Sequence, residues 1–228
     1  MRTMLDHVAI RVMDRAATTA ELLNLLEVEV IEQTERFTLI GPHADFGKIT
    51  LLDAEGDEAP SAERIVALML TGGVHGASTP PIELKCGLRL TFVDAAQIAP
   101  HGHDLPQHAL VGMSLRASDP SMVAAELKRM HGMHIDSVGA EVAMVSIGEA
   151  GNGRISISRE RWDSTRPALL DHIGFRISDV NLWEHEAIER GIEVVRRVEA
   201  PHSTAVFVTG PEQLLLEYVE LTAAFQSA

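Results

Sequence analysis

The sequence predicts an α+β protein built from repeated β-α-β-β-β modules. The main observation is an internal repeat: residues 5–14 (LDHVAIRVMD) recur as residues 170–179 (LDHIGFRISD). A weaker third copy occupies residues 110–119 (LVGMSLRASD), in which Gly112 replaces the histidine. A sequence repeat of this kind constrains the whole architecture before single residues are considered.

Each copy opens with an alternating pattern that is typical of a strand with one packed face. In the first copy the apolar residues at positions 8, 10 and 12 share one face, while His7 and Arg11 lie on the other. The last copy places His172 and Arg176 in the same way. We therefore expect both histidines to line a cavity on the face opposite the apolar stripe.

A helix and three further strands are predicted to follow in each copy. Asp14, Asp119 and Asp179 are suited to cap the helix N-termini. The expected helices cover residues 15–26, 121–130 and 181–190. The expected strands cover residues 28–32, 37–40 and 48–52 after the copy at 5–14, residues 135–138, 142–147 and 154–158 after the weaker copy at 110–119, and residues 193–198, 205–209 and 214–219 after the copy at 170–179.

These spacings predict two halves. The N-terminal half, residues 1–105, contains a clear module at 5–54 and an eroded one at 55–105, with strands expected at 64–70 and 82–93. The C-terminal half, residues 106–228, contains modules at 110–160 and 170–222.

Composition limits the class of protein and its partners. A chain of 228 residues that is 46% hydrophobic and 23% charged is typical of a globular protein. Its net charge of −14 argues against nucleic acid and anionic membranes as partners. No signal peptide or membrane-spanning run is visible, and the single Cys86 cannot form an internal disulfide. We expect a cytoplasmic location, a small-molecule substrate and no membrane, and we leave a homodimer open.

The repeat resembles the vicinal oxygen chelate superfamily, which includes glyoxalase I, methylmalonyl-CoA epimerase, extradiol dioxygenases and bleomycin resistance proteins. The resemblance rests on the opening LDH-x-x-x-R-x-x-D pattern and on the closing Gly-Pro turn before a strand with a glutamate. It implies modules paired into half-barrel clefts, with a divalent metal held from first and fourth strands. The implied ligands are His7, His172 and Glu217. This ligand set requires the first and last modules to pair with each other, whereas in the superfamily neighbouring modules usually form the pair.

Two histidines and one carboxylate form the ligand set of non-haem Fe(II) sites, so Fe(II) is the first candidate, with Mn, Zn, Ni or Co as alternatives. Glu217 supports this independently, because a carboxylate in an apolar strand is costly to bury unless it is paired or metal-bound. The alternative is that Glu217 pairs with Arg11 or Arg176 and the histidines only line a cavity. Thr50 takes the fourth-strand place in the first module, and the third module, with Gly112 and Ser156, is expected to bind no metal.

The segment from His202 to Glu217 also resembles the extradiol dioxygenase signature, in which a histidine precedes a turn with proline and a ligand glutamate. His202, Pro211 and Glu217 match it, but Phe207 stands where the tyrosine belongs. The resemblance assigns His202 as an acid or base, and we add Arg11 and Arg176 to the catalytic set.

Three functions remain open: an extradiol-type dioxygenase, a glyoxalase- or epimerase-like lyase or isomerase, and a metal-free binding or resistance protein. Thr50 at the fourth ligand position leaves the metal site open, which favours the dioxygenase. The second normally needs another fourth-strand carboxylate or glutamine. A rival metal site is conceivable in the loop that contains His101, His103, Asp104 and His108.

Overall fold

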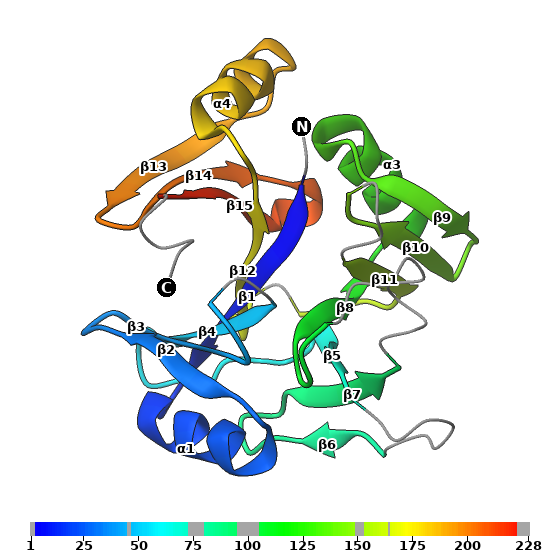
Figure 1. The fold of residues 1–228 in the computed structure, drawn as a ribbon. Helices are drawn as coiled ribbons and strands as arrows, with labels where there is room; N and C mark the ends of the chain where they lie inside the picture. Colours follow the sequence, from blue (N-terminus) through cyan, green and yellow to red (C-terminus); the bar gives the residue numbers. More distant parts are fainter. Residues whose placement is uncertain are drawn as a thin grey trace.

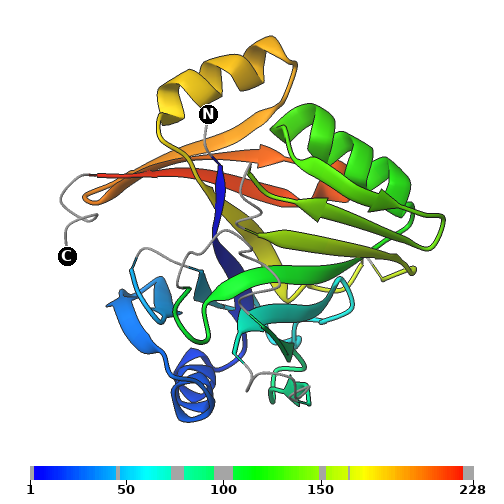
Figure 2. The same cartoon turned by 45° about the vertical axis from the view of Figure 1, so that its right-hand side comes forward.

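The computed structural model describes residues 3–44, 47–72, 80–94, 105–148, 153–163 and 165–222. These residues form two mixed β-sheets with few helices, in the α+β architecture that the repeat predicts. The sheets lie against each other, with α4 and α1 toward opposite ends of the molecule (Figures 1 and 2).

The first sheet joins the first and last modules into an eight-stranded half-barrel, in the order β13-β14-β15-β12-β1-β4-β3-β2. β1 and β12 pair antiparallel at the centre of this sheet, so the first module pairs with the last one. The first module consists of β1 (Met4–Val12), α1 (Arg15–Leu25), β2 (Glu29–Gln33), β3 (Phe37–Gly41) and β4 (Lys48–Asp53). The last consists of β12 (Leu170–Arg176), α4 (Val180–Glu189), β13 (Val194–Ala200), β14 (Ser203–Thr209), the 3-10 turn η1 (Pro211–Gln213) and β15 (Leu215–Leu221).

The second sheet has seven strands in the order β6-β7-β5-β8-β11-β10-β9. Its β5 pairs antiparallel with β8 and parallel with β7, as β1 does with β12 and β4. Each sheet therefore combines strands from both sides of residue 105, and the proposed halves stay a prediction. The second sheet and its helix consist of β5 (Ile65–Thr71), β6 (Ile82–Glu83), β7 (Arg89–Val93), β8 (Leu110–Ala117), α3 (Pro120–His131), β9 (His134–Val138), β10 (Val142–Ser146) and β11 (Arg154–Arg159).

One expected strand is split in the structure. The sequence predicts a single strand over residues 82–93, but β6 and β7 are separate and pair antiparallel. A tight turn divides them, in which Gly87 donates its N–H to Leu84. Gly87 has a φ of +84°, a conformation that glycine adopts without steric cost.

The three predicted N-caps are confirmed. The side chain of Asp14 accepts from the N–H of Ala17, and that of Asp179 accepts from the N–H of Leu182. Asp119 caps α3, which ends at Gly132 in the left-handed conformation. The caps fix where each chain segment leaves its first strand and turns back over the sheet.

The helices cover one face of the half-barrel. Leu22 of α1 and Trp183 of α4 are buried in the core, and Trp183 stacks on Tyr218 of β15 at 3.6 Å between ring centroids. Because side chains alternate along a strand, Glu217 points to the opposite, concave face. The candidate ligands lie on this concave face, opposite the helices.

Candidate metal centre

The strand register brings the two repeat histidines together at the middle of the half-barrel. His7 of β1 lies opposite Gly174 of β12, and His172 lies opposite Ala9. Glu217 of β15 pairs with the same Gly174. Neighbours across a ladder share a face, so His7 and Glu217 approach each other over a glycine.

Gly174 is what makes this approach sterically feasible. A Cβ atom at residue 174 would lie 2.3 Å from Cε1 and 2.7 Å from Nε2 of His7. Any other residue here would push the His7 ring away from Glu217.

The three proposed ligand atoms converge on one point. His7 Nε2 lies 3.1 Å from His172 Nε2 and 3.0 Å from Glu217 Oε2. His172 Nε2 lies 2.8 Å from the same carboxylate oxygen. The three residues are 6–8% exposed and form the one group of three His, Cys, Asp or Glu ligand atoms found among the described residues.

Each imidazole is held at its other nitrogen by the aspartate that precedes it. His7 Nδ1 lies 2.9 Å from Asp6, and His172 Nδ1 lies 2.5 Å from Asp171. A carboxylate at Nδ1 keeps the proton on that nitrogen and leaves the Nε2 lone pair free to bind a cation.

Each aspartate is in turn held by the arginine of the other repeat. Arg176 donates from Nε to Asp6 at 2.9 Å, and Arg11 donates from Nε to Asp171 at 2.7 Å. Lys48 adds an ion pair to Asp6 at 2.9 Å. The crossed pairs tie the two modules together behind the ligands, which is where the structure places both arginines of the predicted catalytic set.

The electrostatics of this cluster fit a cation. Two imidazoles whose Nδ1 atoms donate to aspartates present two Nε2 lone pairs and a carboxylate oxygen to one point, and acceptors this close repel unless a positive charge lies between them. Without a metal that charge is a proton: burial alone would lower the pKa of His7, but Glu217 and Asp6 raise it to about 9. Burial likewise opposes ionisation of Glu217, yet the two imidazoles hold its pKa well below its usual range. A divalent ion suits this donor set.

Thr50 occupies the place equivalent to Glu217. Ala9 pairs with Thr50 as Gly174 pairs with Glu217, and the repeat aligns Ala9 with Gly174. The ligand set is therefore asymmetric, with a carboxylate on one side and a neutral hydroxyl on the other. In the second sheet Gly112 and Ser156 stand at the ligand places on β8 and β11, as the sequence predicts.

The structure does not bring His202 to the other predicted residues. His202 lies exposed in the turn between β13 and β14, next to the pair formed by Ser203 and Leu221. Glu217 pairs with Phe207, which is five residues beyond His202, and this corresponds to roughly 17 Å along a strand. Its role as an acid or base stays a prediction.

The rival loop site falls mostly outside the described residues, which exclude His101, His103 and Asp104. His108 is described, and its Nδ1 accepts from the backbone N–H of Glu27 at 2.7 Å. Cys86 is half-buried, and burial raises the pKa of its thiol.

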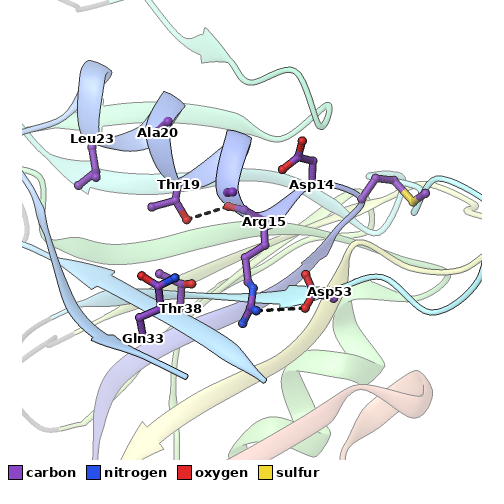
Figure 3. A pocket seen from close by; sticks show the side chains of 10 residues that line it. Asp14, Arg15, Thr19, Ala20, Leu23, Gln33, Thr38 and Asp53 are labelled. Carbon is purple, nitrogen blue, oxygen red and sulfur yellow. Dashed lines mark hydrogen bonds and ion pairs between the residues drawn. The ribbon is translucent and has the colours of Figure 1, made fainter. Parts of the chain in front are cut away.

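A separate pocket of about 570 Å³ lies between α1 and the strands of the first module (Figure 3). Arg15 points across it to Asp53, 3.3 Å away, and Gln33 and Thr38 line the same space. Gln33 and Thr38 are on the helix-covered face, so this pocket is not continuous with the ligand cluster.

Sequence reasoning missed several residues that shape the site. It gave no role to Asp6, Asp171 or Lys48, although both aspartates precede the histidines in the repeat. It also overlooked Gly174, whose importance depends on a close approach between two strands that only their register reveals.

Comparison with solved structures identifies the fold. A Bacillus subtilis protein described as a proposed dioxygenase matches with a TM-score of 0.74 at 12% identity, over 98% of this chain and 87% of that one. Glyoxalase I from Zea mays matches with a TM-score of 0.69 at 12% identity, over 96% of this chain and 92% of that one. No family model and no curated protein matches the sequence.

The chain therefore shares its fold with these two proteins, which agrees with the architecture that the sequence resemblance implies. At these identities the likeness establishes the fold and leaves the activity open. No helix within the described residues has the length and apolar character to span a membrane.

Proposed function

We propose that this protein is a metal-dependent enzyme that acts on a small molecule bound to the metal through two oxygens, and that its reaction is an extradiol-type dioxygenation. The observation that supports this most directly is the convergence of His7, His172 and Glu217 beside a neutral Thr50. Because the three protein ligands would approach the metal from one side, the side nearer Thr50 would stay open for substrate.

In this proposal the residues of the site bind the metal, orient its ligands and exclude water. A bound Fe(II) ion would supply a centre that binds a vicinal diol and still admits O₂. Asp6 and Asp171 fix the two imidazole rings so that Nε2 of each faces the centre. Phe207 packs edge-on against His172 at 5.2 Å and keeps water from that side of the ring.

The metal test uses protein purified without a His-tag. We expect about one divalent ion per chain by elemental analysis, with Fe(II) supporting activity. His172→Ala should abolish binding and preserve the fold, because one ligand is lost from a face with no helix over it. The matched control is His185→Ala, an exposed histidine on α4 of the same module.

The reaction test is O₂ consumption by protein that has been reconstituted anaerobically with Fe(II). We expect uptake with a catechol-like substrate from a panel of vicinal diols, and none with His172→Ala. Metal-loaded protein that consumes no O₂ with any diol would contradict the dioxygenase proposal while leaving the metal site intact.

A second candidate is a glyoxalase- or epimerase-like lyase or isomerase. Phe207 favours it, because this residue stands in the place of the dioxygenase tyrosine and offers no hydroxyl group. Isomerisation of a thiohemiacetal or an acyl-CoA by Ni(II)- or Co(II)-loaded protein would support this candidate. Protein that binds no divalent ion would instead indicate a metal-free binding or resistance function. A cytoplasmic location and a homodimer stay predictions.

A further inference from the structure

Arg196 ends a row of side chains that begins at the ligand cluster. Arg196 of β13 pairs with Phe207 of β14, which pairs with Glu217 of β15. Glu217 pairs with Gly174, which lies opposite His7. Residues that pair across neighbouring strands share a face, so Arg196 lies on the concave face at the edge strand of the half-barrel.

The contacts agree with this register. The guanidinium of Arg196 lies over the ring of Phe207, 4.0 Å from its centroid. The same ring meets His172 edge-on at 5.2 Å. One aromatic ring therefore separates a positive charge from a proposed metal ligand.

Arg196 differs sharply from its neighbour Arg197. Arg197 points to the helix-covered face, where it donates to Glu184 at 2.6 Å and to Asn181 at 3.0 Å. Within the part of the chain that the structure describes, no carboxylate lies at ion-pair distance from Arg196, whose one ring contact is Phe207. Its hydrogen-bond donors are thus available to a bound anion.

The opposite wall of the half-barrel has the reverse charge. Glu32 of β2 pairs with Leu39, and Leu39 pairs with Thr50. Thr50 pairs with Ala9, which lies opposite His172. Glu32 therefore stands at the place that Arg196 has on the other side, and an anionic group is disfavoured there.

Resting on the metal function proposed above, we infer that the substrate has an anionic group such as a carboxylate, and that Arg196 determines specificity by binding it. The metal-chelating oxygens lie at the ligand cluster, an apolar part lies along Phe207, and the anion meets the guanidinium at the sheet edge. Ala205, Val219 and Leu221 form one buried cluster with Phe207 and extend the apolar wall.

The test uses Co(II)-loaded protein and two O,O-chelating probes, acetohydroxamic acid and the same hydroxamate with a carboxylate on its tail. Binding is followed through the visible absorption of Co(II), so the measurement does not depend on turnover. We expect the carboxylated probe to bind about fivefold more tightly, with a preference that decreases as salt is added, since the guanidinium is exposed.

Arg196→Gln should remove this preference and change the affinity for acetohydroxamic acid less than about twofold. Arg196→Lys should retain part of the preference, because it keeps the charge and loses the planar donor set. The matched control Arg197→Gln should keep the full preference, since that side chain lies on the other face.

Co(II)-loaded protein with equal affinity for both probes, or with an unchanged preference in Arg196→Gln, would overturn the role of Arg196 and leave the metal site standing. Protein that binds no Co(II) would overturn the proposed function and this inference together.

Discussion

Replacing Gly174 by alanine tests how strictly the strand register controls the proposed metal centre. The added Cβ atom would lie 2.3 Å from Cε1 and 2.5 Å from Nδ1 of His7, far inside ordinary van der Waals contact. Gly174 does not have a positive φ, so alanine introduces no backbone strain and the effect is steric. The ring must move by roughly 1 Å to restore normal packing.

Such a displacement matters because a metal–nitrogen bond is only about 2.1 Å long. Loss of an outer hydrogen-bond partner costs about 10–100-fold in metal affinity, and moving a ligand itself should cost more. We expect Gly174→Ala to weaken metal binding by at least about 100-fold, with roughly 1–3 kcal/mol of destabilisation from overpacking.

The assay is competition with a chromophoric chelator, with urea unfolding measured in parallel. The control is Gly191→Ala, which has a φ of +72° and nothing within 4 Å of its added Cβ. That variant should lose about 1 kcal/mol of stability and keep its metal affinity. Wild-type affinity in Gly174→Ala would refute the proposed role of His7.

Three further predictions concern one residue of the site and two contacts between the last module and the region of α3. Asp171→Asn should lower metal affinity about 10–100-fold by chelator competition, because the amide no longer fixes the neighbouring imidazole. Burial lowers the pKa of His131 from 6.5 to about 3, so its contribution to stability is complete above pH 6.5 and is lost as the pH falls toward 3. His131→Asn, which keeps a hydrogen-bonding group beside the Tyr218 hydroxyl, should flatten the pH dependence of urea unfolding by up to about 1.4 kcal/mol per pH unit in that range. Glu212→Ala should cost about 1–2 kcal/mol in the same assay, because its carboxylate accepts from the N–H and hydroxyl of Ser118 beside the start of α3.

The repeat made most of the fold predictable. Alternation, an aspartate cap and a helix recur in each copy, so three helices and twelve strands could be located within a few residues of their observed bounds. Residues 55–105 were harder, because that module lacks the repeat motif. The turn at Gly87 was missed, since residues 82–93 were interpreted as one strand.

The site was predictable to the extent that it follows from the repeat. His7 and His172 share a repeat position, and Glu217 is an isolated carboxylate in an apolar strand, so these three could be chosen from sequence. Whether they meet depends on which modules pair, and the sequence left both pairings open. The pairing of β1 with β12 is a long-range contact that no local pattern encodes.

The departures of the first and last modules from exact symmetry indicate how the site works. The Asp, His and Arg residues of the repeat are the same in both modules, but three other equivalent places hold unlike residues. The last module has Glu217, Phe207 and Arg196 where the first module has Thr50, Leu39 and Glu32. The symmetric residues position two imidazoles, a task that is the same on both sides. The asymmetric ones make the two sides of the centre chemically different: one side has the carboxylate of Glu217, an aromatic wall and an arginine, and the other has a neutral hydroxyl, an aliphatic side chain and a glutamate. Under the proposed function, we expect a substrate that binds through two oxygens to enter in only one favourable orientation, which a symmetric site could not enforce.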